Sequence, residues 1–167
     1  ANADSYMTRS NMVRGDSTVK QITYYTGTEV GEEAADWSQE YNYNGTKTKT
    51  TTIYERSGTG VLLSSTVYKD ELTLANVRTA KPAAAELALL TKKSFTDYEG
   101  TTKGEEKSNY TIAYKSNGID VETTTTYYYH LNATTVPAAP ENFAATAADA
   151  NADSYMTRSN MVRGDST

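Results

Sequence analysis

The sequence predicts a mainly β protein made of antiparallel hairpins, arranged as a β-sandwich or as a meandering sheet, with one short helix. The 167 residues include 28 Thr and 14 Tyr, two residue types that favour strands. Only 23 residues are Ile, Leu, Val or Phe, but the net charge of −5 is too small for the self-repulsion typical of disordered chains. Asn-Gly pairs between segments of alternating polarity indicate the hairpins.

The first hairpin is expected around Asn44-Gly45, which follows Trp37 and precedes a Thr-rich run. A two-residue type I′ turn at this pair needs positive φ at both positions, which Asn and Gly tolerate. Aromatic residues then face β-branched ones across the strands, and opposite charges hold the register. The expected pairs are Tyr43–Thr46, Tyr41–Thr48, Gln39–Thr50 and Trp37–Thr52, with Glu40 opposite Lys49.

The second hairpin is expected around Asn117-Gly118 by the same rule. Its expected pairs are Tyr114–Val121, Ile112–Thr123 and Tyr110–Thr125, with Lys115 opposite Asp120 and Ala113 opposite Glu122.

Three further strands and one helix complete the prediction. Residues 21–26, 61–68 and 94–98 have strand composition and are separated by Gly-containing turns. Residues 81–93 combine a Pro near the start, helix-forming residues inside and Lys at the end, so they predict a short helix. Its Leu87, Leu90 and Leu89 are expected to pack on the sheet.

An exact repeat frames the chain. Residues 1–18 recur unchanged as residues 150–167, at an offset of 149. Either the chain is one repeat unit of a tandem array followed by the start of the next, or a copy of the first segment was appended. The first explanation divides the chain into a β-rich repeat unit (1–136), a Pro/Ala-rich junction (137–149) and the start of the next unit (150–167).

The second copy is expected to form an edge strand that completes the preceding unit. Its residues 154–162 have the length of a strand and a weak alternation of side chains. We therefore expect the contact between repeat units to involve Tyr155, Met156, Met161 and Val162. The following Arg163-Gly164-Asp165, like Arg14-Gly15-Asp16, matches a short integrin-binding tripeptide and is also a good turn on its own.

The composition excludes several classes of protein. Without Cys and with one His, the chain has no disulfide framework, no Cys/His zinc site and no thiol nucleophile, and no cofactor is expected. No apolar run approaches 18 residues, so no membrane span is expected. The acidic balance, without a Lys/Arg cluster, argues against nucleic acid as a partner.

Catalytic candidates are few, and we expect no enzyme. His130 stands at the end of a predicted strand, where we expect it to be exposed, and no Gly-x-Ser-x-Gly motif accompanies it. Carboxylates that could act in glycoside hydrolysis are more simply solvated charges on β faces. They are Glu40, Glu55, Asp120 and Glu122.

Two binding features have competing interpretations. Trp37, Tyr41 and Tyr43 could stack against a sugar, or they could pack in the sheet. Asp149, Asn151 and Asp153 have the spacing that begins a calcium loop, but Ser154 replaces the expected Gly and Asn160 the expected Glu. The alternative for these residues is a polar linker with capping side chains.

Three Tyr-containing turn motifs suggest a family resemblance. They are Tyr41-Asn-Tyr-Asn-Gly45, Tyr98-Glu-Gly100 and Tyr114-Lys-Ser-Asn-Gly118. With the 149-residue period and the absence of Cys, they resemble bacterial extracellular tandem-repeat proteins of the adhesin-stalk or fibre type and, more distantly, YD-repeat proteins. The resemblance implies an extracellular or cell-surface scaffold whose partners are copies of itself, with a glycan- or host-receptor-binding module as the alternative. It supplies no catalytic residues.

Overall fold

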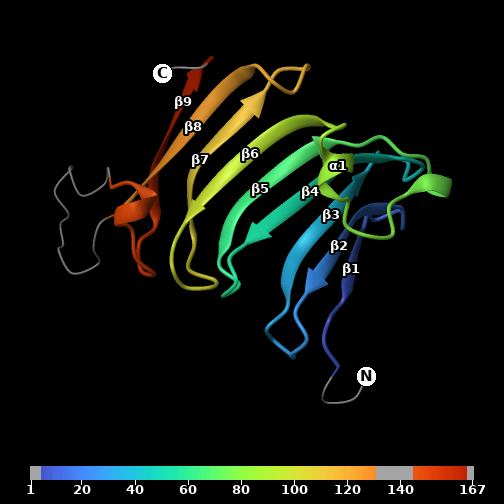
Figure 1. Cartoon of the computed structure of the whole chain (residues 1–167), viewed down its shortest axis with the longest axis horizontal. Helices are drawn as coiled ribbons and strands as arrows, with labels where there is room; N and C mark the ends of the chain where they lie inside the picture. Colours follow the sequence, from blue (N-terminus) through green and yellow to red (C-terminus); the bar gives the residue numbers. More distant parts are fainter. Residues whose placement is uncertain (1–4, 131–144, 165–167) are drawn as a thin grey trace. The chain divides into compact units, whose positions relative to one another are not determined.

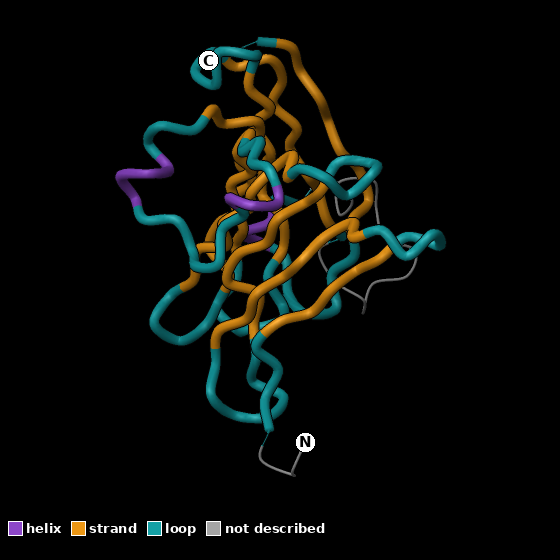
Figure 2. Tube along the Cα trace, turned by 90° about the vertical axis from the view of Figure 1, so that its right-hand side faces the viewer, coloured by secondary structure: helices purple, strands orange, loops and turns teal. Residues whose placement is uncertain are grey.

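The computed structural model describes residues 5–130 and 145–164 and shows a mainly β protein. Nine strands follow one another in chain order in one sheet, and the pairs that can be described are antiparallel (Figure 1). Of the two predicted arrangements, the meandering sheet is therefore confirmed. Figure 2 shows how short the helical segments are. The strands are β1 (Arg9–Val13), β2 (Val19–Thr26), β3 (Ala34–Tyr41), β4 (Thr48–Arg56), β5 (Leu62–Lys69), β6 (Thr91–Glu99), β7 (Lys107–Tyr114), β8 (Val121–Tyr129) and β9 (Met156–Arg163). The helical segments are η1 (Leu74–Asn76), α1 (Ala84–Leu87) and η3 (Ala147–Asp149).

The chain divides into two compact parts. The first part contains Ala1–Tyr54 and Thr66–Lys92, and the second contains Glu55–Ser65 and Lys93–Thr167. Each part holds one copy of the duplicated segment, so the two copies have separate surroundings.

The core of the first part is aromatic and small. Trp37, Ile53 and Tyr68 are buried together, and the Trp37 ring stacks on Tyr24 with centroids 4.0 Å apart. Leu87 and Leu90 pack against this cluster, as expected, whereas Leu89 is 86% exposed. The predicted helix over 81–93 is too long: α1 is a single turn, and Thr91 already begins β6. A helix this short is stable only through tertiary packing, which the partly buried Leu87 and Leu90 provide.

A buried ion pair holds the segment before α1 in the first part. The Asp70 side chain is 1% exposed and accepts hydrogen bonds from Arg78 Nε and Thr51 Oγ1, both at 2.7 Å. Arg78 also contacts Glu86 at 2.8 Å, and Glu86 accepts a hydrogen bond from the Ala83 amide. The hydrogen bond to Asp70 raises the pKa of Arg78. These contacts fix where α1 meets the sheet.

The two Asn-Gly hairpins form, but their turns are not type I′. In the second hairpin the Gly118 amide donates to the Lys115 carbonyl, so the turn begins one residue earlier than predicted. Only Gly118 (φ 70°) and its counterpart Gly45 (φ 68°) are left-handed in these loops, because Ser17 is the only described non-glycine residue with positive φ. Asn117 instead uses its side-chain oxygen to accept hydrogen bonds from the Ile119 and Asp120 amides.

The predicted register is correct for the strand pair nearest each turn and wrong further along the strands. The predicted pair Tyr43–Thr46 does not form, because Tyr43 lies inside the turn that begins at Asn42. Tyr41 pairs with Thr48 and Tyr114 with Val121, as expected. The register then shifts by one residue in both hairpins, so that Trp37 pairs with Ile53 instead of Thr52. The shift places two buried side chains opposite each other, at 3% and 2% exposure. In the first hairpin the burial of these two side chains favours the shifted register, and in both hairpins a bulge absorbs the extra residue.

The described pairs after the shift differ from the predicted ones by one residue in the second strand. They are Gln39–Thr51, Glu40–Thr50, Ile112–Thr124, Ala113–Thr123 and Tyr110–Thr126.

The second part is held by hydroxyl contacts across its strands. Thr96 and Thr111 hydroxyls lie 2.9 Å apart, and Thr111 lies 3.1 Å from the Tyr127 hydroxyl. At the end of β8, Tyr129 exchanges backbone hydrogen bonds with Ala145, which is 5% exposed. The end of the predicted junction is thus packed against β8.

Candidate inter-unit interface

The first copy of the duplicated segment pairs through one edge of β1. Its register with β2 runs from Arg9 opposite Tyr24 to Val13 opposite Val19. The Tyr25 amide donates to the Thr8 carbonyl at 3.0 Å, and the Arg14 amide donates to the Thr18 carbonyl at 2.8 Å. Backbone groups alternate in direction along a strand, so the even-numbered residues 8, 10, 12 and 14 face β2. The odd-numbered residues 9, 11 and 13 face the opposite edge, and β1 is the first strand of the sheet order.

The second copy pairs through β9, which lies beside β8 (Figure 1). Its register runs from Arg163 opposite Thr123 to Arg158 opposite Tyr128, and then shifts at Thr157. The Gly164 amide donates to the Glu122 carbonyl at 2.8 Å. Residues 158, 160, 162 and 164 therefore face β8, whereas residues 159, 161 and 163 face away from it.

The structure places all four predicted contact residues on or beside β9. Met156 pairs with Tyr129, Met161 with Thr125 and Val162 with Thr124. Tyr155 just precedes the strand, and its carbonyl accepts a hydrogen bond from the His130 amide at 3.0 Å. The side chains of Tyr155, Met156 and Met161 remain 56%, 49% and 66% exposed. They therefore leave apolar surface uncovered within the described structure.

Sequence reasoning missed the residues of β8 that receive this strand. Arg158 lies over the Tyr128 ring, 4.3 Å from its centroid, which is a cation–π contact. Tyr129 is buried, and this burial raises the pKa of its hydroxyl, which donates to the Ser108 carbonyl at 2.7 Å. The run Tyr127-Tyr128-Tyr129 was the signal in the sequence for these contacts. Its pairing with the second copy follows only from the register of β8 and β9.

The expectation of an exposed His130 is wrong. His130 is 4% exposed, and its ring stacks on Tyr155 with centroids 4.9 Å apart. Tyr155 belongs to the duplicated segment, so this segment covers the imidazole. His130 is thus part of the packing between β8 and the second copy.

The first Arg-Gly-Asp sequence forms a closed turn. The Arg14 guanidinium donates to the carbonyl oxygens of Val19 and Tyr41 at 2.8 and 3.3 Å. Asp16 accepts hydrogen bonds from the Thr18 hydroxyl and amide, which lower the pKa of its carboxyl. Both charged side chains therefore make hydrogen bonds within the chain.

The second Arg-Gly-Asp sequence is only partly described. Arg163 ends β9 with an exposed side chain, and Gly164 has a φ of 78°. Asp165 lies outside the described residues.

The aromatic platform considered as a sugar site does not form. Trp37 and Tyr41 are 3% and 4% exposed, whereas Tyr43 is 80% exposed in the turn. The rings therefore offer no shared accessible face, and the alternative of sheet packing holds for Trp37 and Tyr41.

The oxygen-bearing residues around the start of the second copy make local hydrogen bonds. Asp149 accepts a hydrogen bond from the Thr146 hydroxyl, and Asn151 accepts one from the Asp153 amide. Among residues 5–130 and 145–164, no group of three or more His, Cys, Asp or Glu side chains could hold a metal ion. These contacts fit a polar linker, but the N-cap residue of η3, Thr146, makes no side-chain capping hydrogen bond.

The carboxylates considered for hydrolysis lie in ordinary surface environments. Glu40 accepts a hydrogen bond from Thr50 at 3.2 Å, and Asp120 accepts one from Asn117 at 2.9 Å. Glu55 and Glu122 are exposed. Their environment matches that of solvated charges on a β face.

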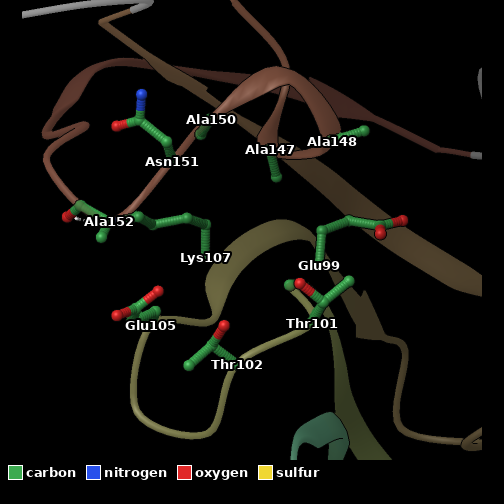
Figure 3. Close-up of a pocket in the computed structure, with 11 residues that line it drawn as sticks. Glu99, Thr101, Thr102, Glu105, Lys107, Ala147, Ala148, Ala150, Asn151 and Ala152 are labelled. Carbon is green, nitrogen blue, oxygen red and sulfur yellow. Dashed lines mark hydrogen bonds between the residues drawn. The ribbon is translucent and has the colours of Figure 1, made fainter.

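A hollow of about 350 Å³ lies within the second part, between the loop after β6 and the segment that leads to the second copy (Figure 3). Figure 3 shows Lys107 pointing toward Ala152, and its Nζ donates to the Ala152 carbonyl at 3.2 Å. Ala147, Ala148 and Ala150 form the opposite wall. The hollow therefore marks where the end of the junction rests on the sheet.

Comparisons with known proteins identify no relative: no family model, no curated protein and no solved structure matches the chain. In the part of the chain that the structure describes, no helix is long and apolar enough to cross a membrane.

Proposed function

We propose that this chain is a structural repeat unit of an extracellular fibre, stalk or adhesin, whose units join end to end through the duplicated segment. In this proposal the protein carries out no chemical turnover, and its partners are copies of itself. The Tyr/Thr ladders suit a scaffold, and the absence of Cys leaves no thiol that could be oxidised outside the cell.

One observation carries the proposal. The same 18-residue sequence supplies the first strand of the sheet order, against β2, and the last strand, against β8. A segment that pairs with both the beginning and the end of a unit can connect two consecutive units. An array of such units has one continuous sheet instead of a row of open edges, which otherwise favour aggregation.

The alternative of a glycan- or receptor-binding module has less support. The rings proposed for sugar stacking are mostly buried, and Arg14 and Asp16 make hydrogen bonds within their own loop. Binding to a glycan array by the whole chain would revive this alternative.

The proposal is tested with chains that contain one, two or three 149-residue periods, each ended by residues 150–167. If the sheet continues, every added period contributes eight strands, and a strand spacing of roughly 4.8 Å gives about 38 Å of added length. Small-angle X-ray scattering measures this increment. A matched two-period chain with a Gly/Ser sequence in place of the middle 18 residues serves as the flexible control. Scattering from the native two-period chain that matches this control would overturn the proposal.

A further inference from the structure

We propose that the outer edge of β1 is a docking edge for β8 of a second copy of this chain, in the register that β9 shows. The inference rests on the proposed function and deepens it by naming the partner strand and the contacts. It assigns each edge of the duplicated strand to a different neighbour.

The backbone geometry of the two copies is complementary. In β9 the residues that face β8 are Arg158, Asn160 and Val162. Their counterparts in the first copy are Arg9, Asn11 and Val13, which face away from β2. The hydrogen-bonding groups that β9 uses toward β8 are therefore the groups that β1 leaves toward its outer edge. One strand can pair with β8 of one copy and β2 of another at the same time.

The side chains of the two partners also fit this arrangement. Arg158 lies over Tyr128, and its counterpart Arg9 is paired with Tyr24. In the combined register one arginine has a tyrosine from each neighbouring copy beside it. The exposure of the repeated valine differs between the two copies. Val13 on β1 is 55% exposed, whereas its counterpart Val162, beside β8, is partly buried. Docking of β8 is expected to cover Val13 in the same way.

Within a single chain, β9 is already paired with the edge of β8 and so blocks this docking. Because β1 has the same sequence as β9, β1 of a second copy can make the same contacts with β8 that β9 makes. The second copy of the segment therefore acts as an internal cap. Weakening β9 alone should allow β1 of another chain to take its place, and this contact leads to open linear assembly.

The experiment uses the full chain with Asn160→Pro. Proline lacks the amide hydrogen that this position directs toward β8, so β9 is weakened while β1 is unchanged. We expect linear oligomers whose weight-average mass rises roughly twofold or more with concentration, measured by light scattering and electron microscopy. A variant that stays monomeric at all concentrations while its β9 amides lose protection from hydrogen exchange would overturn the inference.

Two matched variants separate specific docking from aggregation. Adding Asn11→Pro to Asn160→Pro removes the corresponding amide hydrogen from the outer edge of β1, so the oligomers should disappear. Oligomers that persist in this double variant would show that another surface is responsible and would overturn the inference. Met161→Pro alone changes an amide that points away from β8, so this chain should remain monomeric.

The outcomes also separate this inference from the proposed function. Linear assembly of the Asn160→Pro chain tests the edge of β1 directly, without any tandem chain. If the edge does not dock but the two-period chain still lengthens by a constant increment, the units join in another way. If the edge docks but the two-period chain is flexible, the array function fails and the edge assignment stands.

Discussion

The two copies of the duplicated segment have the same sequence and different structures. In the first copy the strand spans Arg9–Val13, whereas in the second it spans Met156–Arg163 and so begins earlier and ends later in the segment. Ser154 is 5% exposed, but its counterpart Ser5 is exposed. Since the sequence is constant, the surroundings of the two copies cause these differences. The strand paired with β8 is therefore longer than the strand paired with β2.

The comparison also shows that one sequence can offer two different edges. The first copy is bound to β2 through its even-numbered residues and the second to β8 through the counterparts of the odd-numbered ones. Strand formation is thus a property of the segment, whereas the choice of edge depends on the neighbour.

Removing residues 150–167 should cause the largest loss of stability. The deletion removes β9, uncovers His130 and leaves β8 with an open edge. From the cross-strand pairs lost we expect roughly 2–5 kcal/mol, which corresponds to a fall in Tm of about 5–15 °C. Thermal unfolding followed by circular dichroism measures the effect. An unchanged melting curve would show that the second copy is only the beginning of an independent unit.

Proline at equivalent positions should act on only one copy. The Ser10 amide faces β2, so Ser10→Pro removes a ladder hydrogen bond and should cost about 2–3 kcal/mol. The Ser159 amide faces away from β8, so Ser159→Pro should cost less than about 0.5 kcal/mol. Urea unfolding measures both values.

Ser10→Ala is the control for the side chain, because the Ser10 hydroxyl lies 3.0 Å from the Tyr25 hydroxyl. Equal losses in the two proline variants would mean that both copies use the same edge, contrary to the structure.

Local sequence signals predicted the elements better than their registers. Asn-Gly located both hairpins, and the pairs next to the turns, Tyr41–Thr48 and Tyr114–Val121, were found as expected. The predicted type I′ turn was wrong, because only the glycine of each Asn-Gly pair takes the left-handed conformation. In the second hairpin the Asn117 side chain instead accepts a hydrogen bond from the backbone of the turn. The bulges were not predictable, since they depend on which side chains the core buries, such as Ile53 opposite Trp37.

The candidate interface was predictable in location but not in detail. The exact repeat pointed to residues 150–167, and strand length and alternation pointed to β9. The burial of His130 could not be predicted, because it depends on Tyr155 stacking over the end of β8. The opposite edges of the two copies follow only from the identity of their neighbours, which a single sequence does not reveal.

Gly118→Val should destabilise the second hairpin by more than about 1 kcal/mol, because Gly118 has a φ of 70° that a β-branched residue strongly disfavours. Gly118→Asn is the control, since Asn tolerates the left-handed region and should cost clearly less. Thermal or urea unfolding distinguishes the two variants. Equal costs would mean that the loss arises from the added volume and not from the backbone.

The glycine of the duplicated segment should be sensitive in one copy only. Gly164 has a φ of 78°, whereas Gly15 lies outside the left-handed region, and an added Cβ would meet no atom within 4 Å at either position. Gly164→Ala should therefore cost about 1 kcal/mol through the backbone alone. Gly15→Ala should be neutral, or should stabilise by up to about 0.5 kcal/mol through the unfolded state. A measurable loss in Gly15→Ala would contradict the difference between the two turns.

The smallest expected difference concerns the repeated arginine. Arg158 lies 4.3 Å from the centroid of the Tyr128 ring, so Arg158→Gln should cost about 0.5–1 kcal/mol. Arg9 has only Tyr24 opposite it in the β1–β2 ladder, and Arg9→Gln should cost less than Arg158→Gln in the single chain. In the two-period chain the middle arginine gains both tyrosines, so its replacement should cost more than either single-chain change. Urea unfolding of these three variants and of the two parent chains measures this order. A middle arginine no more sensitive than Arg9 would show that the two tyrosines are not brought to the same strand.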